Sequence, residues 1–445
     1  MASVFPYLLL PLSIGVMLGA MAITKKLANH YGLDAEVQRK SVHVVTGLFA
    51  ISLPWILPEP LMVYILLGLS VVVMLVLRLP ALSSGGLGDV VHGVKRKSWG
   101  DLMLVAAVAT VFFIYQREGA PVLYILPLAV LTLSDSAAAL AGSAYGRVKF
   151  TIEEGQKSIE GSAIFFMVTL ILAMIALLLL SDMDRHKLVI LAIMTAAFAT
   201  VVEADSWRGF DNYFVPVGVL FLLAFHGDSS MLSLVLLAAT FIAVIIAFNA
   251  YGKRFLGLSA HSARAYTAGI FMISAVADLQ NVFLPLAALL AQTFARKMRP
   301  STADHPDLDM LAMLATTSFV VLIGGLFMDM TAISFYNAMI AFMVIQLIIL
   351  ALPSKNLALK GATVLIAATA LVVAVALVIA LNGPAASWHR DFTLVLWFGL
   401  VLAGGIGLFR PGFYDDLRHA KIGAIAFFPA LIAYFVEYQV VGGPS

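Results

Sequence analysis

The sequence predicts an all-α, polytopic membrane protein with about 15–16 transmembrane segments and no soluble domain. Of its 445 residues, 62% are hydrophobic and only 12% are charged, whereas soluble domains are nearer half apolar and a quarter charged. Apolar runs of about 18 or more residues recur from end to end, each long enough to cross a bilayer. A membrane β-barrel would instead show short alternating segments, which are absent from the sequence.

The first apolar run lies close to the N-terminus and is followed by the positive charges Lys25 and Lys26. A secretory signal carries its positive charges before the apolar run, so we interpret this segment as a retained first helix. The chain has no cysteine, which excludes a disulfide framework and a cysteine-ligated metal site.

Hydropathy predicts the remaining spans in order along the chain. With the first span included, they are 5–24, 42–57, 61–78, 101–116, 121–143, 161–181, 187–203, 212–226, 231–250, 266–279, 282–296, 309–328, 331–352, 360–381, 391–409 and 421–440. The segment 266–296 is either one helix or a hairpin of two passes around Gln280.

The distribution of lysine and arginine favours two passes at 266–296. With two passes, 23 of the 27 basic residues lie on one side of the membrane, and only Arg117, Arg185, Lys187 and Arg390 lie on the other. This asymmetry is what the positive-inside rule predicts, and a single pass would invert everything downstream. We therefore expect an integral, multi-pass protein of the cytoplasmic membrane, with both termini outside the cytoplasm.

The unusual polar residues all lie before about residue 250, which divides the chain into residues 1–250 and 251–445. For residues 251–445 the sequence predicts ordinary membrane helices of unknown role. This part could handle lipid, form the contact of a homo-oligomer or carry a second activity.

Four polar clusters occupy predicted cytoplasmic helix ends. The first is "QRKSVHVVTG", with Arg39, Lys40 and His43. Arg39 and His43 are spaced i, i+4, so they share a helix face and can converge on one anion. The alternative, which spacing alone slightly favours, is a basic anchor at the lipid headgroups.

The second cluster is "LTLSDSAAALAGSAYGR", in which Asp135, Gly142 and Gly146 share one helix face. Asp135 precedes Gly146 by about 11 residues, which puts it roughly 16 Å into the membrane. An ionisable group at that depth indicates a functional site, and it needs a divalent cation or a basic side chain as partner. The glycines could equally provide a surface where a neighbouring helix approaches closely.

The third cluster is "GRVKFTIEEGQKSIEGS", a short loop that leads into the span at 161–181. Its cations are Arg147, Lys149 and Lys157, and its helix start contains Ser158, Glu160 and Gly161. Ser158 is a predicted N-cap, and a helix N-terminus suits phosphate. A capped helix with solvated lysines is the alternative.

The fourth cluster is "VVEADSWRGFDNYFVPVG". Glu203 ends one span, and Asp211 with Asn212 begins the next. Asp211 could serve only as a helix N-cap, which is the commonest use of aspartate there.

Together the clusters supply carboxylates and cations at one membrane face. Carboxylates can hold Mg²⁺, cations and helix N-termini can hold phosphates, and one carboxylate can accept a proton from an alcohol. The sequence contains no G-x-x-x-x-G-K-[ST] loop and no protein-kinase signature. The residues alone therefore predict an anionic, phosphorylated ligand at the cytoplasmic face, and we expect no nucleic-acid partner.

The ordered set "RKSVHVVTG", "DSAAALAGSAYGRVKF", "KSIEGS" and "DNYFVPV" resembles the membrane kinase family of dolichol kinase and phytol kinase, over about residues 35 to 226. The resemblance implies transfer of phosphate from a nucleoside triphosphate, typically CTP, to a long isoprenoid alcohol, with Mg²⁺.

The resemblance also implies roles for individual residues. Asp135 would be a catalytic or metal carboxylate, and Asp211 would join it as a second carboxylate of the polar, metal-holding site. The phosphate and nucleotide site would contain Arg39, Lys40, His43, Gly142, Gly146, Arg147, Lys149, Lys157, Ser158, Glu160, Gly161 and Asn212. Glu203 is a candidate general base on its position alone, independent of the resemblance. The roles of Asp205 and Arg208 stay open, because "EADSWRGFDN" departs from the family's small-residue run at this point.

Two alternatives remain. Phosphatidate cytidylyltransferases look similar in the aspartate-to-glycine helix, but their long terminal signature is not found in this sequence. A transporter could use Asp135 and Asp278 to carry protons or ions, but the two halves show no inverted repeat.

Overall fold

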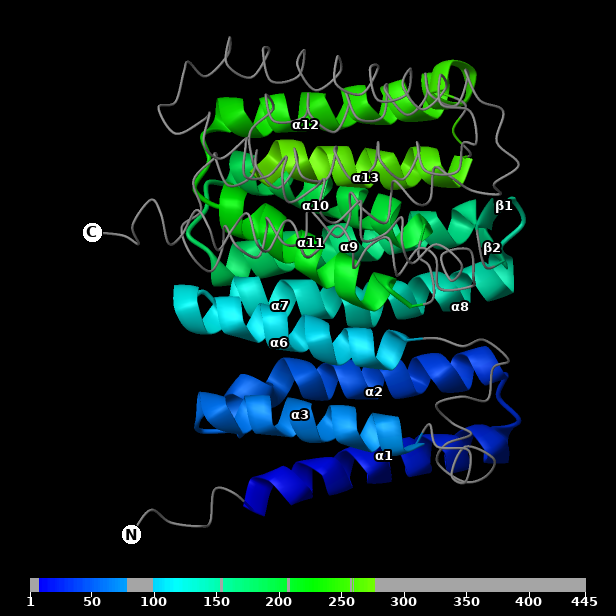
Figure 1. Ribbon diagram of the computed structural model, residues 1–445, viewed down its shortest axis with the longest axis vertical. Coiled ribbons are helices and arrows are strands. Elements are labelled where there is room, and N and C mark those ends of the chain that lie inside the picture. Colours follow the sequence, from blue (N-terminus) through cyan, green and yellow to red (C-terminus); the bar gives the residue numbers. More distant parts are fainter. Residues whose placement is uncertain are drawn as a thin grey trace, which may run out of the picture. The chain divides into compact units, whose positions relative to one another are not determined.

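The structure, a computed structural model, describes residues 8–77, 99–152, 155–205, 209–256, 258 and 260–276. The chain divides into two compact units, Met1–Ala238 and Ala239–Ser445. Among the described residues, six helices are long and apolar enough to cross a membrane, and two shorter apolar helices accompany them (Figure 1). The predicted all-α membrane fold is confirmed for this part of the chain.

The helices of the first unit agree with the predicted spans to within a few residues at most ends. They are α1 (Leu9–Tyr31), α2 (Ala35–Ile56), α3 (Pro60–Leu77), α6 (Gly100–Glu118), α7 (Val122–Ala129), α8 (Asp135–Tyr145), α9 (Ile159–Leu180), α10 (Arg185–Ala204), α11 (Asp211–His226) and α12 (Met231–Ile246), the last of which runs into the second unit. The main difference is α2, which begins at Ala35 and so carries the whole first polar cluster on one helix. The predicted spans from 282 onward lie outside the described residues.

A single apolar segment, Val122–Tyr145, contains both α7 and α8. Between them the chain forms a π-helical turn, η2 (Val130–Ser134), that ends immediately before Asp135. Such turns shift the backbone hydrogen bonds by one residue and often occur at functional sites. The turn therefore determines which way Asp135 points from the helix.

Pro54 interrupts the hydrogen bonding of α2 near its end. Proline has no backbone N–H, so the carbonyl of Ala50, four residues earlier, cannot have its usual helical partner. The hydroxyl of Tyr124 in α7 donates to that carbonyl over 2.6 Å. Tyr124 is fully buried, and this bond ties α2 to α7 at the end away from the polar clusters.

The loop after α8 is a two-stranded antiparallel hairpin of β1 (Lys149–Ile152) and β2 (Gly155–Ser158). The sequence prediction took this segment as a loop, because strands of four residues leave no clear alternation to read. Phe150 pairs with Lys157, and Lys149 pairs with Ser158. The hairpin places Lys157 directly before α9.

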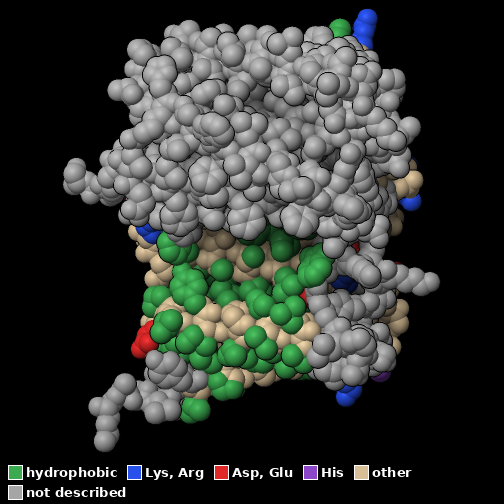
Figure 2. Space-filling model, in the orientation of Figure 1, with side chains coloured by type: hydrophobic (Ala, Val, Ile, Leu, Met, Phe, Trp, Pro, Cys, Tyr) green, Lys and Arg blue, Asp and Glu red, His purple; other side chains and the backbone are tan. Residues whose placement is uncertain are grey.

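Large hydrophobic side chains on the helices remain exposed, as expected of surfaces that face lipid. On α9, Met167, Ile171, Ile175 and Leu178 are between 51% and 60% exposed and recur every three or four residues. Hydrophobic side chains also gather on the described face of the first unit in Figure 2. These apolar faces fit a bilayer environment.

In the described part of the second unit, α13 (Ala260–Val276) packs against the π-helical segment η3 (Ala247–Leu256). The ring of Tyr266 stacks on Phe248, with centroids 5.8 Å apart, and Phe271 lies 4.4 Å from Phe241. The acidic residue singled out in this half, Asp278, lies outside the described residues.

Candidate active site

A cavity of about 680 Å³ lies within the first unit and gathers residues from all four polar clusters. One end is polar and is formed by the start of α2, α8, the hairpin, the start of α9, the end of α10 and the start of α11. The other end is apolar and lies between α1, α2, α3 and α6. The cavity therefore joins a charged chamber to a hydrocarbon-lined channel.

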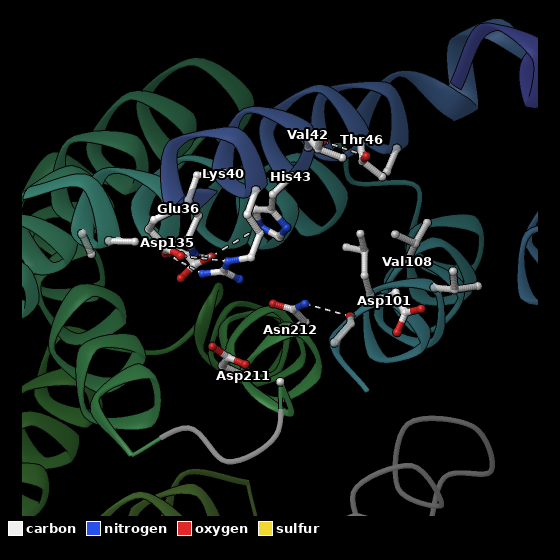
Figure 3. A pocket seen from close by; sticks show the side chains of 18 of the residues that line it. Glu36, Lys40, Val42, His43, Thr46, Asp101, Val108, Asp135, Asp211 and Asn212 are labelled. Atoms are coloured by element: carbon white, nitrogen blue, oxygen red, sulfur yellow. Dashed lines mark hydrogen bonds and ion pairs between the residues drawn. The ribbon is translucent and has the colours of Figure 1, made fainter. Parts of the chain in front are cut away.

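Asp135 lies in the polar chamber and has a basic partner from α2. The Lys40 ammonium group donates a hydrogen bond to the Asp135 carboxylate, and only 4% of the Lys40 side chain is exposed. The His43 Nε2 atom lies 3.5 Å from the same carboxylate oxygen. The basic partner that a membrane aspartate requires is thus Lys40, and Asp135 faces the cavity instead of lipid (Figure 3).

His43 also contacts the π-helical turn. Its Nε2 atom lies 3.2 Å from the carbonyl oxygen of Leu131. Because a carbonyl oxygen can only accept, Nε2 carries the hydrogen in this contact. His43 thereby links α2 to the backbone that positions Asp135.

Arg39 has an acidic partner on its own helix. Its guanidinium group forms a two-bond ion pair with Glu36, at 2.6 and 3.1 Å, and half of its side chain is exposed. That Arg39 and His43 bind one anion stays a prediction, and both residues line the cavity. Burial would raise the pKa of Glu36, but the hydrogen bond and charge of Arg39 outweigh it and hold that pKa below its ordinary value. Both residues line the outer part of the polar chamber.

Lys157 forms a third ion pair of the chamber, with Glu203. Its Nζ atom lies 2.6 Å from Glu203 Oε1, and it also donates to the backbone carbonyl of Glu203. Burial would lower the pKa of Lys157, but the negative charge of Glu203 outweighs it and raises the pKa above its ordinary value. The group is therefore a cation at neutral pH, held at the chamber by the end of α10.

The start of α9 contributes part of the lining of the chamber. The Ser158 hydroxyl accepts a hydrogen bond from the Gly161 amide at 3.1 Å, which confirms Ser158 as the N-cap. A Cβ atom on Gly161 would lie 3.0 Å from the Ala138 carbonyl oxygen and 3.4 Å from the Gly142 Cα atom. The glycines let α8 and α9 cross closely, as the packing interpretation predicted, while Gly142 and Gly161 also line the cavity.

The start of α11 faces Asp135 across the chamber (Figure 3). Asp211 is the first residue of α11 and Phe210 occupies the N-cap position, so the N-cap alternative for Asp211 is not what the structure has. Asn212 donates from Nδ2 to the carbonyl of Gly100 at 2.7 Å, which fixes α11 against the start of α6. Asp211 and Asn212 both line the cavity.

Two carboxylates of the chamber, Asp135 and Asp211, could hold a magnesium ion together with the phosphates of a ligand. Within the described ranges, no group of three or more His, Cys, Asp or Glu side chains is arranged to hold a metal alone. Mg²⁺ in phosphoryl-transfer sites is usually held by one or two carboxylates together with substrate phosphates and water. Asp135 and Asp211 could provide that pair, because both line the same chamber.

Most of the predicted site residues meet in the cavity, but three do not. Gly146, Arg147 and Glu160 lie outside its lining. The Glu160 carboxylate instead accepts hydrogen bonds from the Val148 amide at 3.2 and 3.3 Å, which closes the hairpin onto α9. Arg208 lies outside the described residues.

The sequence prediction missed polar residues that also line the chamber: Glu36, Asp101, Gln156 and Ser162. Two of them had a signal in the sequence. Glu36 precedes Arg39 by three residues, which is the spacing of an ion pair on a helix. Asp101 is a carboxylate in the first turn of a membrane span.

Comparison with known proteins adds one relative. No protein-family model matches the chain. No solved structure matches it. The chain is similar to the phytol kinase of Synechocystis sp. (strain ATCC 27184 / PCC 6803 / Kazusa), with 31% identity over 231 residues that cover 49% of this chain and 94% of the relative. Through its N-terminal half, the chain therefore belongs to the family of polyprenol and phytol kinases.

Proposed function

We propose that the protein transfers the γ-phosphoryl group of a nucleoside triphosphate, CTP in our prediction, to the hydroxyl group of an isoprenoid alcohol. The observation that carries the proposal is the cavity itself, in which a chamber of carboxylates and cations opens into an apolar channel. Such a cavity can hold a phosphorylated, water-soluble donor at one end and a lipid at the other. Kinship with a phytol kinase supports the same reaction class.

The phosphates of the donor bind at the cationic side of the chamber. Among the described residues, the cations that line the cavity beside Lys40 are Lys157 and Lys149 on the hairpin and Arg39 at the outer end. The capped start of α9 adds backbone N–H groups, which favour anions. In phosphoryl transfer, catalysis depends mainly on positioning and on stabilising charge, and this set of residues suits both tasks.

Asp135 positions the reacting groups, and Glu203 accepts the proton. The alcohol oxygen attacks the γ-phosphorus, the bond from that phosphorus to the bridging β-oxygen breaks, and the nucleoside diphosphate leaves. The proton of the alcohol passes to Glu203, whose carboxylate is available once Lys157 turns from it to the phosphates. Mg²⁺ held by Asp135 and Asp211 would neutralise charge on the phosphates.

The lysine and arginine distribution supports a chamber that faces the cytoplasm, because its cations belong to the side with most of the positive charge. Among the residues that the structure describes, those that line the cavity lie between Ser13 and Asn212. This supports residues 1–250 as the kinase part, with a separate role for 251–445. A truncation near residue 250 that retains phosphorylation would support this division.

The test uses CTP labelled at either its γ- or its α-phosphate. Purified full-length protein is incubated with Mg²⁺ and a panel of prenols, and lipid-bound label is measured. A kinase transfers the γ-label only, whereas a cytidylyltransferase given phosphatidic acid transfers the α-label. Absence of any nucleotide consumption, together with solute or ion flux in liposomes, would refute the kinase proposal in favour of a transporter.

A further inference from the structure

The cavity extends about 25 Å along α2, of which the apolar channel beyond His43 takes about 15 Å. Its lining on this helix begins at Glu36 in the polar chamber and ends at Leu53, a distance that follows from about 1.5 Å of rise per residue. Beyond Asp135 and His43, the lining residues of α2 are Thr46, Phe49, Ala50 and Leu53. Along α2, the polar chamber is therefore continuous with the apolar channel.

Three other helices contribute to the wall of the channel. On α3 the channel lining runs from Leu66 to Met74, and on α6 it runs from Leu104 to Val108, beyond Asp101 of the chamber. Helix α1 contributes the flexible side chains of Met17 and Met21. Val108 is visible on α6 in Figure 3. Among the described lining residues, the charged side chains lie at the other end, in the chamber.

The channel closes at the far end. One turn beyond Val108, Phe112 is 1% exposed, and one turn beyond Leu66, Met62 and Val63 are fully buried. The ring of Tyr124 lies 6.0 Å from Phe112, and its hydroxyl holds the Ala50 carbonyl. These packed side chains limit the length of the channel that a ligand can occupy.

The length of this channel can be compared with an alcohol chain. An extended hydrocarbon advances about 1.25 Å per bond, from a bond length of about 1.5 Å and an angle near 111°. One helical turn of about 5.4 Å therefore matches about four bonds, which is the main-chain length of one isoprene unit. Leu53 lies about 15 Å along α2 from His43 and about 20 Å from Lys40.

We propose that the turns of α2 between His43 and Leu53 limit the alcohol to about three or four isoprene units, at roughly one unit per helical turn, with Ala50 and Leu53 as the residues that set the limit. This inference rests on the proposed kinase function. The occupant is the tail of the alcohol whose hydroxyl lies at Asp135, because the channel is continuous with the chamber that holds Asp135. A longer polyprenol meets the closed end and is a poor substrate.

The experiment measures phosphorylation of geraniol, farnesol, geranylgeraniol, phytol and a long polyprenol by the full-length protein. Rates are compared as ratios between alcohols within each variant, so the ratios do not depend on how much protein is folded. The variants are Ala50→Phe, Thr46→Phe and Leu53→Ala. The matched control is Ala22→Phe, because Ala22 is exposed on α1 and does not line the cavity.

In Ala50→Phe we expect the phytol-to-geraniol rate ratio to fall by about 10- to 100-fold, as small changes in a hydrophobic pocket can. Thr46→Phe should move the limit one unit further toward short chains. Leu53→Ala should raise the relative rate with a prenol longer than phytol. Ala22→Phe should keep the wild-type profile.

Each outcome separates this inference from the proposed function. If the wild type phosphorylates no alcohol, the kinase proposal fails and this inference fails with it. If the wild type is active and Ala50→Phe keeps the wild-type profile, the kinase proposal stands and the length limit is wrong. If Ala50→Phe is inactive with every alcohol, Leu53→Ala decides, and an unchanged profile in that variant overturns the inference.

Discussion

The ion pair between Lys40 and Asp135 offers a way to separate the structural role of Asp135 from its catalytic role. The Lys40 side chain is 4% exposed and the Asp135 side chain 13%. Removing one partner of a buried pair leaves an uncompensated charge and costs about 3–5 kcal/mol. We expect the lower end, about 3 kcal/mol, because both residues line a cavity that admits water.

The perturbation is a double-mutant cycle of Lys40→Gln, Asp135→Asn and the two together. Each single change should lower the free energy of unfolding, because it leaves the opposite charge unpaired. The double variant should recover most of the lost free energy of unfolding, because two neutral amides can hydrogen-bond to each other. Turnover should behave differently, since Asp135→Asn should abolish phosphorylation and the double variant should stay inactive.

Stability is measured by thermal or denaturant unfolding in detergent, and turnover by transfer of the γ-label to prenol. The reasoning is refuted if Asp135→Asn keeps near-wild-type turnover. It is also refuted if the double variant regains turnover together with stability, because Asp135 would then be only the counter-ion of Lys40. Equal stability of all four proteins would show that the ion pair is not buried as the structure has it.

Three further predictions follow from other contacts. Lys157→Ala should lower turnover by about 10²–10³-fold, the usual loss for one charge-stabilising donor. Asp278→Asn should leave phosphorylation largely intact. Equal rates for Lys157→Ala and the wild type would contradict the assignment of Lys157 to the active site. Gly47→Ala should destabilise α2, because its Cβ atom would lie 2.1 Å from Thr132 Oγ1, with a loss of about 1–3 kcal/mol. The added change Thr132→Ala should relieve only part of that loss, because the Thr132 Cβ atom would still lie 2.8 Å away. The control is Gly68→Ala, because no atom lies within 4 Å of the Cβ position of Gly68. Tyr124→Phe should lower the free energy of unfolding by about 1–3 kcal/mol, because it leaves the Ala50 carbonyl without a hydrogen-bond donor. Adding Pro54→Ala should recover part of this loss, because residue 54 then has a backbone N–H. If the free energy of unfolding does not recover, another group satisfies the carbonyl.

The sequence alone determined that this chain is built of membrane helices, because the length and apolar character of each run leave few other structures in a bilayer. It also identified Asp135 as the residue to explain, because a carboxylate so far from a helix end is costly in lipid. The N-cap at Ser158 followed from local chemistry, since a cap depends only on residues within one turn.

Only the tertiary structure decided which charges meet. Lys40 and Arg39 are neighbours in sequence, but the packing of α2 turns only Lys40 to Asp135. Arg39 pairs with Glu36 of its own helix, at a spacing that the sequence already contains. Lys157 and Glu203 are 46 residues apart, and no local pattern connects them. The sequence did not predict the apolar channel either, because a membrane helix is apolar on the faces that meet lipid, other helices or a cavity. Hydropathy therefore located the helices, and only their packing could show which of their apolar faces enclose the site.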